Sequence, residues 1–169
     1  MSNTRKLRVQ IMSDDTYAAA LAMLARRELS EAQLRQRLTR RLHSQEAIDD
    51  AVERLKSEHN VDDERAARLI ARAEAGVKKR GRHRVTRQIE AAGIAPSIAR
   101  RVVDETFSTI DADELLNEAL DRRLRGASRI EDDRQFQRLY RQLVAQGFDT
   151  DRVLALLRAR TAKTDAGLQ

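Results

Sequence analysis

The residues of this sequence best suited to acid–base catalysis or metal binding are three histidines and a set of paired aspartates. The histidines are His43, His59 and His83. None has a cysteine partner, because the chain contains no Cys, and no two follow the H-x-x-x-H spacing that places both on one helix face. Three of the four aspartate pairs stand where a helix is predicted to begin, and there Asp accepts free backbone N–H groups. The pairs are Asp14-Asp15, Asp49-Asp50, Asp62-Asp63 and Asp132-Asp133. We therefore interpret the pairs as caps and expect no enzyme activity, no metal site and no cofactor.

Positive charge is concentrated between Lys78 and Arg87, hereafter the basic segment. The chain has 33 Lys+Arg against 27 Asp+Glu, a net charge of +6, and the basic segment holds six of the bases and no acid. These six are Lys78, Lys79, Arg80, Arg82, Arg84 and Arg87. Cations at the end of a helix are favoured by its dipole, which accounts for the first three. The other three lie beyond Gly81, and we interpret all six as a surface that binds an anionic partner.

Two further arginine pairs, Arg40-Arg41 and Arg122-Arg123, could extend this surface. They lie beside acidic residues, so a solvated helix face is the competing interpretation. The basic segment contains no aromatic residue, and a nucleic acid would therefore be held by its phosphates and not by base stacking. With six phosphate contacts on single-stranded DNA, the logarithm of the binding constant would fall with the logarithm of the salt concentration at a slope of about −4.

Composition excludes several classes of protein. Without Cys there is no disulfide scaffold and no thiol catalysis. The apolar stretches run only a few residues and no secretory signal is recognisable, so we expect a cytoplasmic protein without a membrane span. High Ala, Leu, Arg and Glu content with a single Pro is typical of a chain that is almost wholly helical.

Apolar residues at helical spacing predict nine helices in three groups. The first helix is expected from Asp15 to about Glu28, and Ser30 with Gln33 forms a capping-box pattern before the second. Pro96 suits the first position of a later helix, which continues with Ile98, Val102 and Val103. The predicted breaks are His43-Ser44, Gly81, Gly93, Gly126 and Gly147.

The three groups repeat at a period of about 50 residues. The last apolar residue of each middle helix lies ten, nine and ten residues before the first of the next helix: Leu38 to Ile48, Ile89 to Ile98, Leu143 to Val153. One three-helix unit buries little apolar surface, so stacked repeats are expected. The predicted fold class is all-α, with three tandem three-helix repeats forming an elongated, curved, right-handed array. The predicted parts are a flexible N-terminal arm (1–14), the repeats (15–61, 62–110, 111–160) and a C-terminal tail (161–169).

The order of short motifs in these repeats resembles the RecX family of RecA regulators. In the first repeat, the stretch from Tyr17 to Leu38, which reads YAAALAMLARRELSEAQLRQRL, is similar to the family stretch A-x-x-x-L-A-x-R-x-x-S-E-x-E-L-x-x-x-L. Val61-Asp62-Asp63-Glu64-Arg65 is similar to L-D-D-x-R, and Leu139 to Phe148 to L-x-R-x-L-x-R-R-G-F. The resemblance covers roughly residues 16 to 158. The chain departs from the family at Ala66, at Arg82 and at His59-Asn60, where Phe, Pro, and Gly with an aromatic are usual.

Membership of this family would imply a regulator of homologous recombination, DNA repair and the SOS response. Family members bind RecA, especially its filament on single-stranded DNA, occupy the filament groove, and inhibit ATP hydrolysis, strand exchange and co-protease activity. The resemblance thus implies RecA and its filament as partners, with weak direct DNA contact, and we expect a monomer. The alternative is a sequence-independent DNA-binding helical-repeat protein without a recombinase partner.

Overall fold

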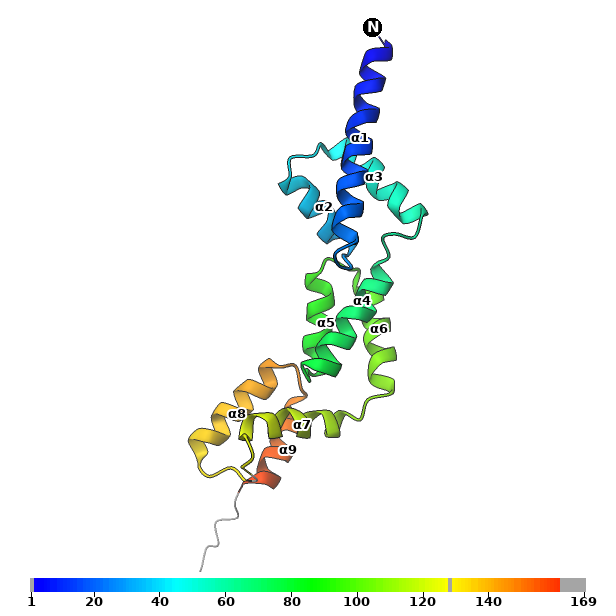
Figure 1. Ribbon diagram of the computed structural model, residues 1–169. Helices are drawn as coiled ribbons and strands as arrows, with labels where there is room; N and C mark the ends of the chain where they lie inside the picture. Colours follow the sequence, from blue (N-terminus) through cyan, green and yellow to red (C-terminus); the bar gives the residue numbers. More distant parts are fainter. Residues whose placement is uncertain (1, 128, 162–169) are drawn as a thin grey trace, which may run out of the picture. The chain divides into compact units, whose positions relative to one another are not determined.

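The computed structural model describes residues 2–127 and 129–161, and in this part of the chain it contains nine α-helices and one π-helical stretch (Figure 1). The all-α prediction is confirmed. None of the described helices is both long and apolar enough to cross a lipid bilayer. The elements are α1 (Ser2–Leu24), α2 (Glu31–Arg40), α3 (Gln45–Ser57), α4 (Asp63–Ala71), the π-helix η1 (Arg72–Val77), α5 (Arg82–Ala91), α6 (Pro96–Ser108), α7 (Ala112–Leu124), α8 (Asp133–Ala145) and α9 (Thr150–Arg160).

Capping side chains fix most of the helix starts. The Ser30 Oγ accepts the Gln33 N–H at 3.1 Å, and the Gln33 side chain accepts the Ser30 N–H, which completes the predicted capping box. Asp62 accepts the N–H groups of Glu64 and Arg65 at the start of α4. Residues Ser44, Asp111 and Asp132 cap α3, α7 and α8. The capping interpretation is therefore confirmed for the Asp62 and Asp132 pairs.

The first helix begins earlier than predicted. α1 starts at Ser2 instead of Asp15 and ends at Leu24 instead of about Glu28. The segment 1–14, predicted as a flexible arm, is thus helical from Ser2 onward, and Asp14-Asp15 lie inside α1 and not at its start. No Gly or Pro occurs among the first 24 residues, and the Arg, Lys, Leu and Gln residues there are good helix formers, so the backbone has no stop before Asp15. The predicted tail lies outside the described residues from 162 onward.

The chain divides into two compact units, Met1–Leu69 with Ile89–Ala99, and Ile70–Gln88 with Arg100–Gln169. The division passes through the second predicted repeat, because α4, α5 and α6 give residues to both units. The repeat boundaries 15–61, 62–110 and 111–160 stay a prediction.

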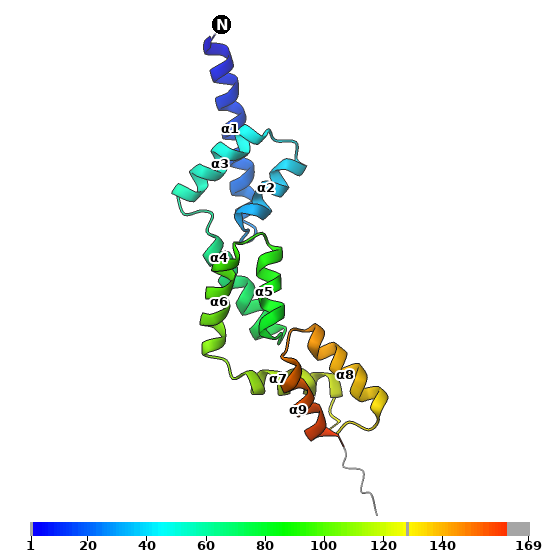
Figure 2. The same ribbon diagram turned by 180° about the vertical axis from the view of Figure 1, so that it is seen from behind.

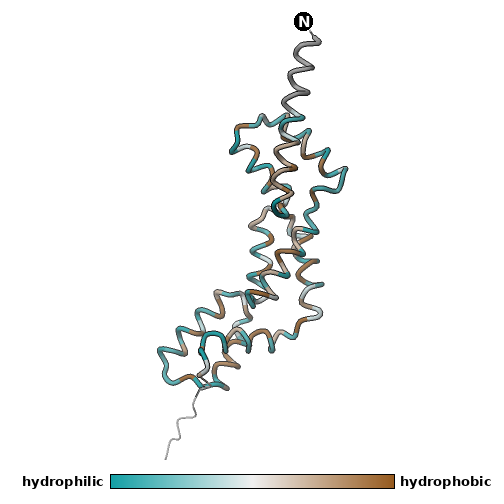
Figure 3. The backbone as a smooth tube through the Cα atoms, in the orientation of Figure 1, coloured by the Kyte–Doolittle hydropathy of each residue, from teal (hydrophilic) through white to brown (hydrophobic). Residues whose placement is uncertain are grey.

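Each unit has an aliphatic core. In the first unit α1, α2 and α3 lie against one another (Figures 1 and 2). In the second unit α7, α8 and α9 do the same. Apolar and hydrophilic positions alternate along these helices at helical spacing (Figure 3). The buried residues include Leu34, Leu38, Ile48, Val52 and Leu55 in the first core, and Leu116, Leu120, Leu143, Val153 and Leu157 in the second.

Twice, the end of one helix docks on the start of a helix earlier in the chain, α5 on α2 and α8 on α5. Within the first unit, the Ser30 hydroxyl before α2 donates to the carbonyl of Ala92, which follows α5. Within the second unit, the N–H groups of Gly81 and His83 at the start of α5 donate to the carbonyls of Gln146 and Gly147, which follow α8, at 3.0 and 3.2 Å. A helix start has free N–H groups and a helix end has free carbonyls, so each docking satisfies groups that would otherwise need water.

Glycine makes these dockings close. Gly93 has a φ of +77°, and a Cβ atom there would overlap the Cβ atom of Ala32. Gly147 has a φ of +86°, and its Cβ atom would overlap the backbone N of Arg84. Gly81 would in turn overlap the carbonyl of Gly147. The glycines predicted only as helix breaks therefore also leave room for a neighbouring backbone.

Candidate functional site

The basic segment lies wholly in the second unit, where it joins η1 to α5. The helix widens to π geometry over Arg72–Val77 and then ends through two backbone bonds, from the Lys78 N–H to the Ala73 carbonyl and from the Arg80 N–H to the Glu74 carbonyl, at 3.1 and 3.0 Å. Lys79 between them adopts a φ of +52°, which is uncommon for a residue with a side chain. The chain thus makes a tight turn at Lys79, and the side chains of Lys78 and Arg80 on either side of it both reach Glu74.

Glu74 is a buried carboxylate that organises the start of the basic segment. Its side chain is 5% exposed, accepts a hydrogen bond from Lys78 Nζ at 2.6 Å, and pairs with the Arg80 guanidinium through its other oxygen. Burial raises the pKa of Glu74, but the hydrogen bonds from Lys78 and Arg80 together lower it more, so the pKa lies below its ordinary value. Glu74 is therefore ionised at neutral pH and fixes two of the six cations.

Two more cations of the basic segment are paired with acids that are distant in the sequence. Lys79 Nζ lies 2.6 Å from a carboxylate oxygen of Glu118 on α7. The Arg82 guanidinium pairs with Asp104 on α6 and lies 5.9 Å from the centre of the Phe107 ring. Four of the six cations are therefore paired with acids that lie outside the basic segment in the sequence.

Arg84 and Arg87 are the members that have no side-chain ion pair or hydrogen bond among the described residues. Both are on α5, with Arg87 exposed and Arg84 half-buried. Six cations thus face three carboxylates, Glu74, Glu118 and Asp104, so the segment keeps an excess of positive charge, smaller than its sequence suggests.

The predicted extension separates into parts. Arg122 on α7 donates to the carbonyl of Val77 at 3.0 Å and so lies next to the basic segment. Arg123 is half-buried and donates to the Ala119 carbonyl of its own helix at 2.7 Å, and burial lowers its pKa. Arg40 and Arg41 belong to the other unit, where both are exposed at the end of α2. Of the four residues, the structure joins Arg122 to the segment.

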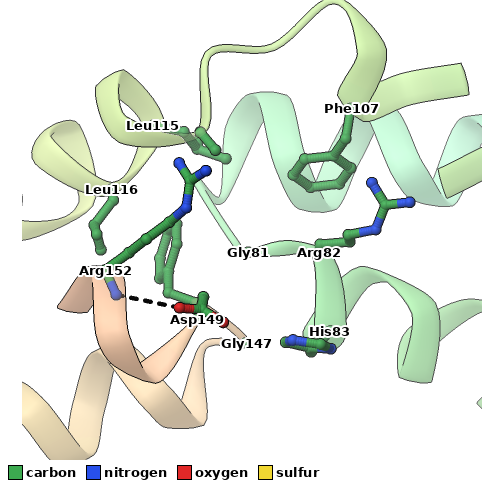
Figure 4. A pocket seen from close by; sticks show the side chains of 11 residues that line it. Gly81, Arg82, His83, Phe107, Leu115, Leu116, Gly147, Asp149 and Arg152 are labelled. Atoms are coloured by element: carbon green, nitrogen blue, oxygen red, sulfur yellow. Dashed lines mark hydrogen bonds between the residues drawn. The ribbon is translucent and has the colours of Figure 1, made fainter. Parts of the chain in front are cut away.

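A pocket of about 290 Å³ opens beside the basic segment, within the second unit (Figure 4). Gly81, Arg82 and His83 form one part of its lining, and α7 and the start of α9 form another. The side chains of Phe107, Leu115, Leu116 and Phe148 make much of the surface apolar. Arg152 reaches the pocket from α9. Its backbone N–H donates to the Asp149 carboxylate at 3.2 Å. The pocket can take an apolar group, and its two lining arginines, Arg82 and Arg152, are paired with Asp104 and Asp113.

Sequence reasoning missed the acids that neutralise the segment and the pocket beside it. Glu74 had a local signal, because it stands four residues before Lys78 and so shares a helix face with it. Glu118, Asp104 and Phe107 had none, since only the fold brings them to the segment. The described residues include no group of three or more potential metal ligands.

Comparison with known proteins gives concordant results. A family model described as "RecX, first three-helix domain" matches residues 17–55. A "Regulatory protein RecX" of Syntrophotalea carbinolica is 33% identical over 135 residues, covering 79% of this chain and 88% of the relative. A second "Regulatory protein RecX", of Halorhodospira halophila, is 30% identical over 156 residues, covering 92% of this chain and 94% of the relative.

Solved structures share the fold. One described as "Crystal structure of regulatory protein RecX" matches with a TM-score of 0.73 and 17% identity, covering 92% of this chain and 76% of that chain. Another, "Crystal structure of RecX from Lactobacillus salivarius", matches with a TM-score of 0.64 and 16% identity, covering 89% and 97%. At this identity the likeness concerns the fold alone.

Proposed function

The chain belongs to the RecX family of regulatory proteins, and on that basis we propose that it binds RecA and the RecA filament on single-stranded DNA. Bound in the filament groove, it inhibits ATP hydrolysis, strand exchange and co-protease activity. It acts by binding and not by catalysis, as a monomer and in the cytoplasm, where the filament forms. The names of its relatives and the fold support this proposal.

The observation that favours a protein partner over DNA alone is the apolar pocket next to the basic segment. Arg82 belongs to both, and Phe107, Leu115 and Leu116 line the pocket. A phosphate backbone has no apolar group that would fill such a pocket, whereas protein interfaces combine an apolar centre with charged surroundings. We assign the contact surface to the pocket together with the two cations of the segment that have no partner among the described residues, Arg84 and Arg87.

The structure decides which substitutions test this surface. Reversing Arg80 to Glu would place a second carboxylate beside the buried Glu74, so loss of inhibition could reflect loss of folding. Arg84 and Arg87 have no partner among the described residues, so their charges can be removed without breaking an internal pair. The test variant is Arg84→Gln with Arg87→Gln. The matched control is Arg134→Gln with Arg138→Gln, two exposed arginines of α8 whose side chains have no ion pair in the described part of the chain.

The assay is RecA ATPase activity on single-stranded DNA with the protein titrated in. Two exposed ion pairs contribute about 1 kcal/mol each, so the concentration for half-inhibition should rise roughly tenfold or more for the test variant and stay near wild type for the control. Equal inhibition by wild type and a folded test variant would remove the basic segment from the interface. Absence of any inhibition by the wild-type protein would overturn the proposed function itself.

A second substitution tests the pocket separately. Ala112→Phe adds a large side chain to the lining at the start of α7. It should weaken inhibition while leaving binding to naked single-stranded DNA unchanged, because DNA does not use the pocket. Parallel loss of both activities would favour the alternative, a DNA-binding protein without a recombinase partner.

A further inference from the structure

A second cationic site lies in the first unit, away from the residues of the basic segment in the sequence. It is a hollow of about 360 Å³ between the end of α1 and the end of α2, hereafter the arginine hollow. Five arginines and two apolar side chains line it: Arg26, Arg27, Arg37, Arg40, Arg41, Met23 and Leu29. Arg26 and Arg41 also line a smaller adjoining hollow with Ala22 and Met23, so the cationic surface is continuous there.

The five guanidinium groups are not used inside the described part of the protein. None of them forms an ion pair or donates a side-chain hydrogen bond to another described residue. Four are exposed, and Arg37 is half-buried. Several other arginines of the first and second units are paired: Arg35 with Glu31, Arg65 with Glu28, and Arg160 with Asp121. The arginine hollow therefore differs from the basic segment, where four of six cations are neutralised.

Helix-end stabilisation does not account for this cluster. Arg37 and Arg40 stand in the last turn of α2, where the helix dipole favours cations. A capping role would direct the guanidinium groups to the last carbonyls, and none of the five donates to a described carbonyl. Five like charges around one hollow repel one another, and an anion that enters it relieves that repulsion.

We propose that the arginine hollow binds the phosphodiester backbone of single-stranded nucleic acid. Its arginine side chains offer only hydrogen-bond donors, in the planar forks that fit the oxygens of a phosphate. An acidic peptide also brings backbone N–H groups, and the lining side chains include no carboxylate, amide or hydroxyl to accept them. The lining contains no aromatic side chain, so the site reads phosphates and not bases. This inference does not rest on the recombinase partner proposed above.

The test measures binding of a labelled oligo(dT) by fluorescence anisotropy at several salt concentrations, without RecA. The test variant is Arg26→Ala with Arg40→Ala and Arg41→Ala, all exposed positions. The matched control removes three exposed arginines from α8: Arg134, Arg138 and Arg141. If each arginine of the hollow neutralises one phosphate, the slope of log K against log salt should become shallower by about 2, and affinity at 0.1 M salt should fall roughly 100-fold. The control should stay within a few-fold of wild type.

Three results would overturn the proposal. Equal losses in the test and control variants would show that net charge alone governs binding. Tight binding of polyglutamate to the wild type, lost in the test variant, would assign the hollow to an acidic protein segment. Oligo(dA) and oligo(dT) affinities that differ more than tenfold would show base recognition. Thermal unfolding of all variants checks that they are folded. The proposed function, which we assign to the basic segment, is tested separately by the RecA ATPase assay.

Discussion

The buried carboxylate of Glu74 offers the sharpest test of how the basic segment is held. We expect Glu74→Gln, which keeps the size of the side chain and removes its charge, to lower the free energy of unfolding. Glu74 accepts two charge-assisted hydrogen bonds, from Lys78 and Arg80, and such bonds contribute about 1.5–3 kcal/mol each when buried. The Lys78 and Arg80 side chains are 52% and 26% exposed, so water recovers much of that loss, and we expect about 2 kcal/mol.

The pH dependence gives this prediction a direction. In the folded protein the pKa of Glu74 lies below its ordinary value. The contribution of Glu74 to the free energy of unfolding is therefore complete above its pKa in the unfolded chain and disappears as pH falls through its pKa in the folded protein. Gln does not titrate. The difference between wild type and Glu74→Gln should therefore be full at pH 7 and shrink below about pH 4, near the ordinary pKa of Glu.

The measurement is denaturant unfolding at pH 7 and pH 3, with thermal unfolding in parallel. For a chain of this size about 2 kcal/mol corresponds to a Tm decrease of roughly 4–8 °C. The matched control is Glu90→Gln, an exposed carboxylate of α5 with no ion pair among the described residues, which should change stability by less than about 0.5 kcal/mol. A Glu74→Gln protein as stable as wild type at pH 7, or one with the same deficit at both pH values, would refute the reasoning.

Two further predictions concern the docked helix ends, and both are checked by thermal unfolding of paired variants. Gly81→Ala should destabilise the protein by more than about 1 kcal/mol, because the added Cβ would overlap the Gly147 carbonyl. Its control, Gly76→Ala in η1, places the Cβ in open space and should stabilise the protein by about 0.5 kcal/mol. Equal effects of the two substitutions would show that the docking is not close. Ser30→Ala should lower the free energy of unfolding by about 2 kcal/mol, because it removes a helix cap and leaves the Ala92 carbonyl without its donor. Its control, Ser44→Ala, removes only an exposed cap and should lower the free energy of unfolding by about 1 kcal/mol. A smaller loss at Ser30 than at Ser44 would contradict the docking.

The helices that were predicted well are those whose ends are encoded locally. The Ser30 capping box, Pro96 at the first position of α6 and the left-handed Gly93 and Gly147 all occupy their predicted places. Such signals act within one turn of helix, so a single sequence contains them completely. The predicted start of α1 was wrong because Ser13 and Asp14, although they are residue types that cap helices, lie in a segment of helix formers without Gly or Pro, and the helix continues through them.

The face of α4 could not be predicted from apolar spacing. Leu69, the largest apolar residue type in this helix, is 46% exposed, while Ala67, Ala71 and Ala75 are buried. Alanine is a weak signal in a hydrophobicity pattern, yet its small size allows close packing. Glu74 lies three residues after Ala71 and is buried on the same side, and no residue spacing predicts the π-helical stretch that contains it.

The candidate site was predicted in its charge but not in its pairing. The run from Lys78 to Arg87 is visible in the sequence, and so is its lack of internal acids. Glu118 and Asp104 come from helices 22 or more residues away, and their approach depends on tertiary packing. For the same reason the arginine hollow was not predicted as one site: Arg26-Arg27 and Arg40-Arg41 are separate pairs in the sequence, and the packing of α1 on α2 gathers them around one hollow.

The left-handed glycines that follow α5 and α8 have a counterpart after α2 that is not glycine. Leu42 follows α2 as Gly93 follows α5 and Gly147 follows α8, and it adopts the same left-handed conformation, with a φ of +64°. Its side chain is 92% exposed, so no earlier helix start docks against it. The turn itself therefore tolerates a side chain, and glycine is required only where the turn meets the start of an earlier helix. Glycine at such a turn thus marks a docked helix end, whereas a larger residue marks a free one.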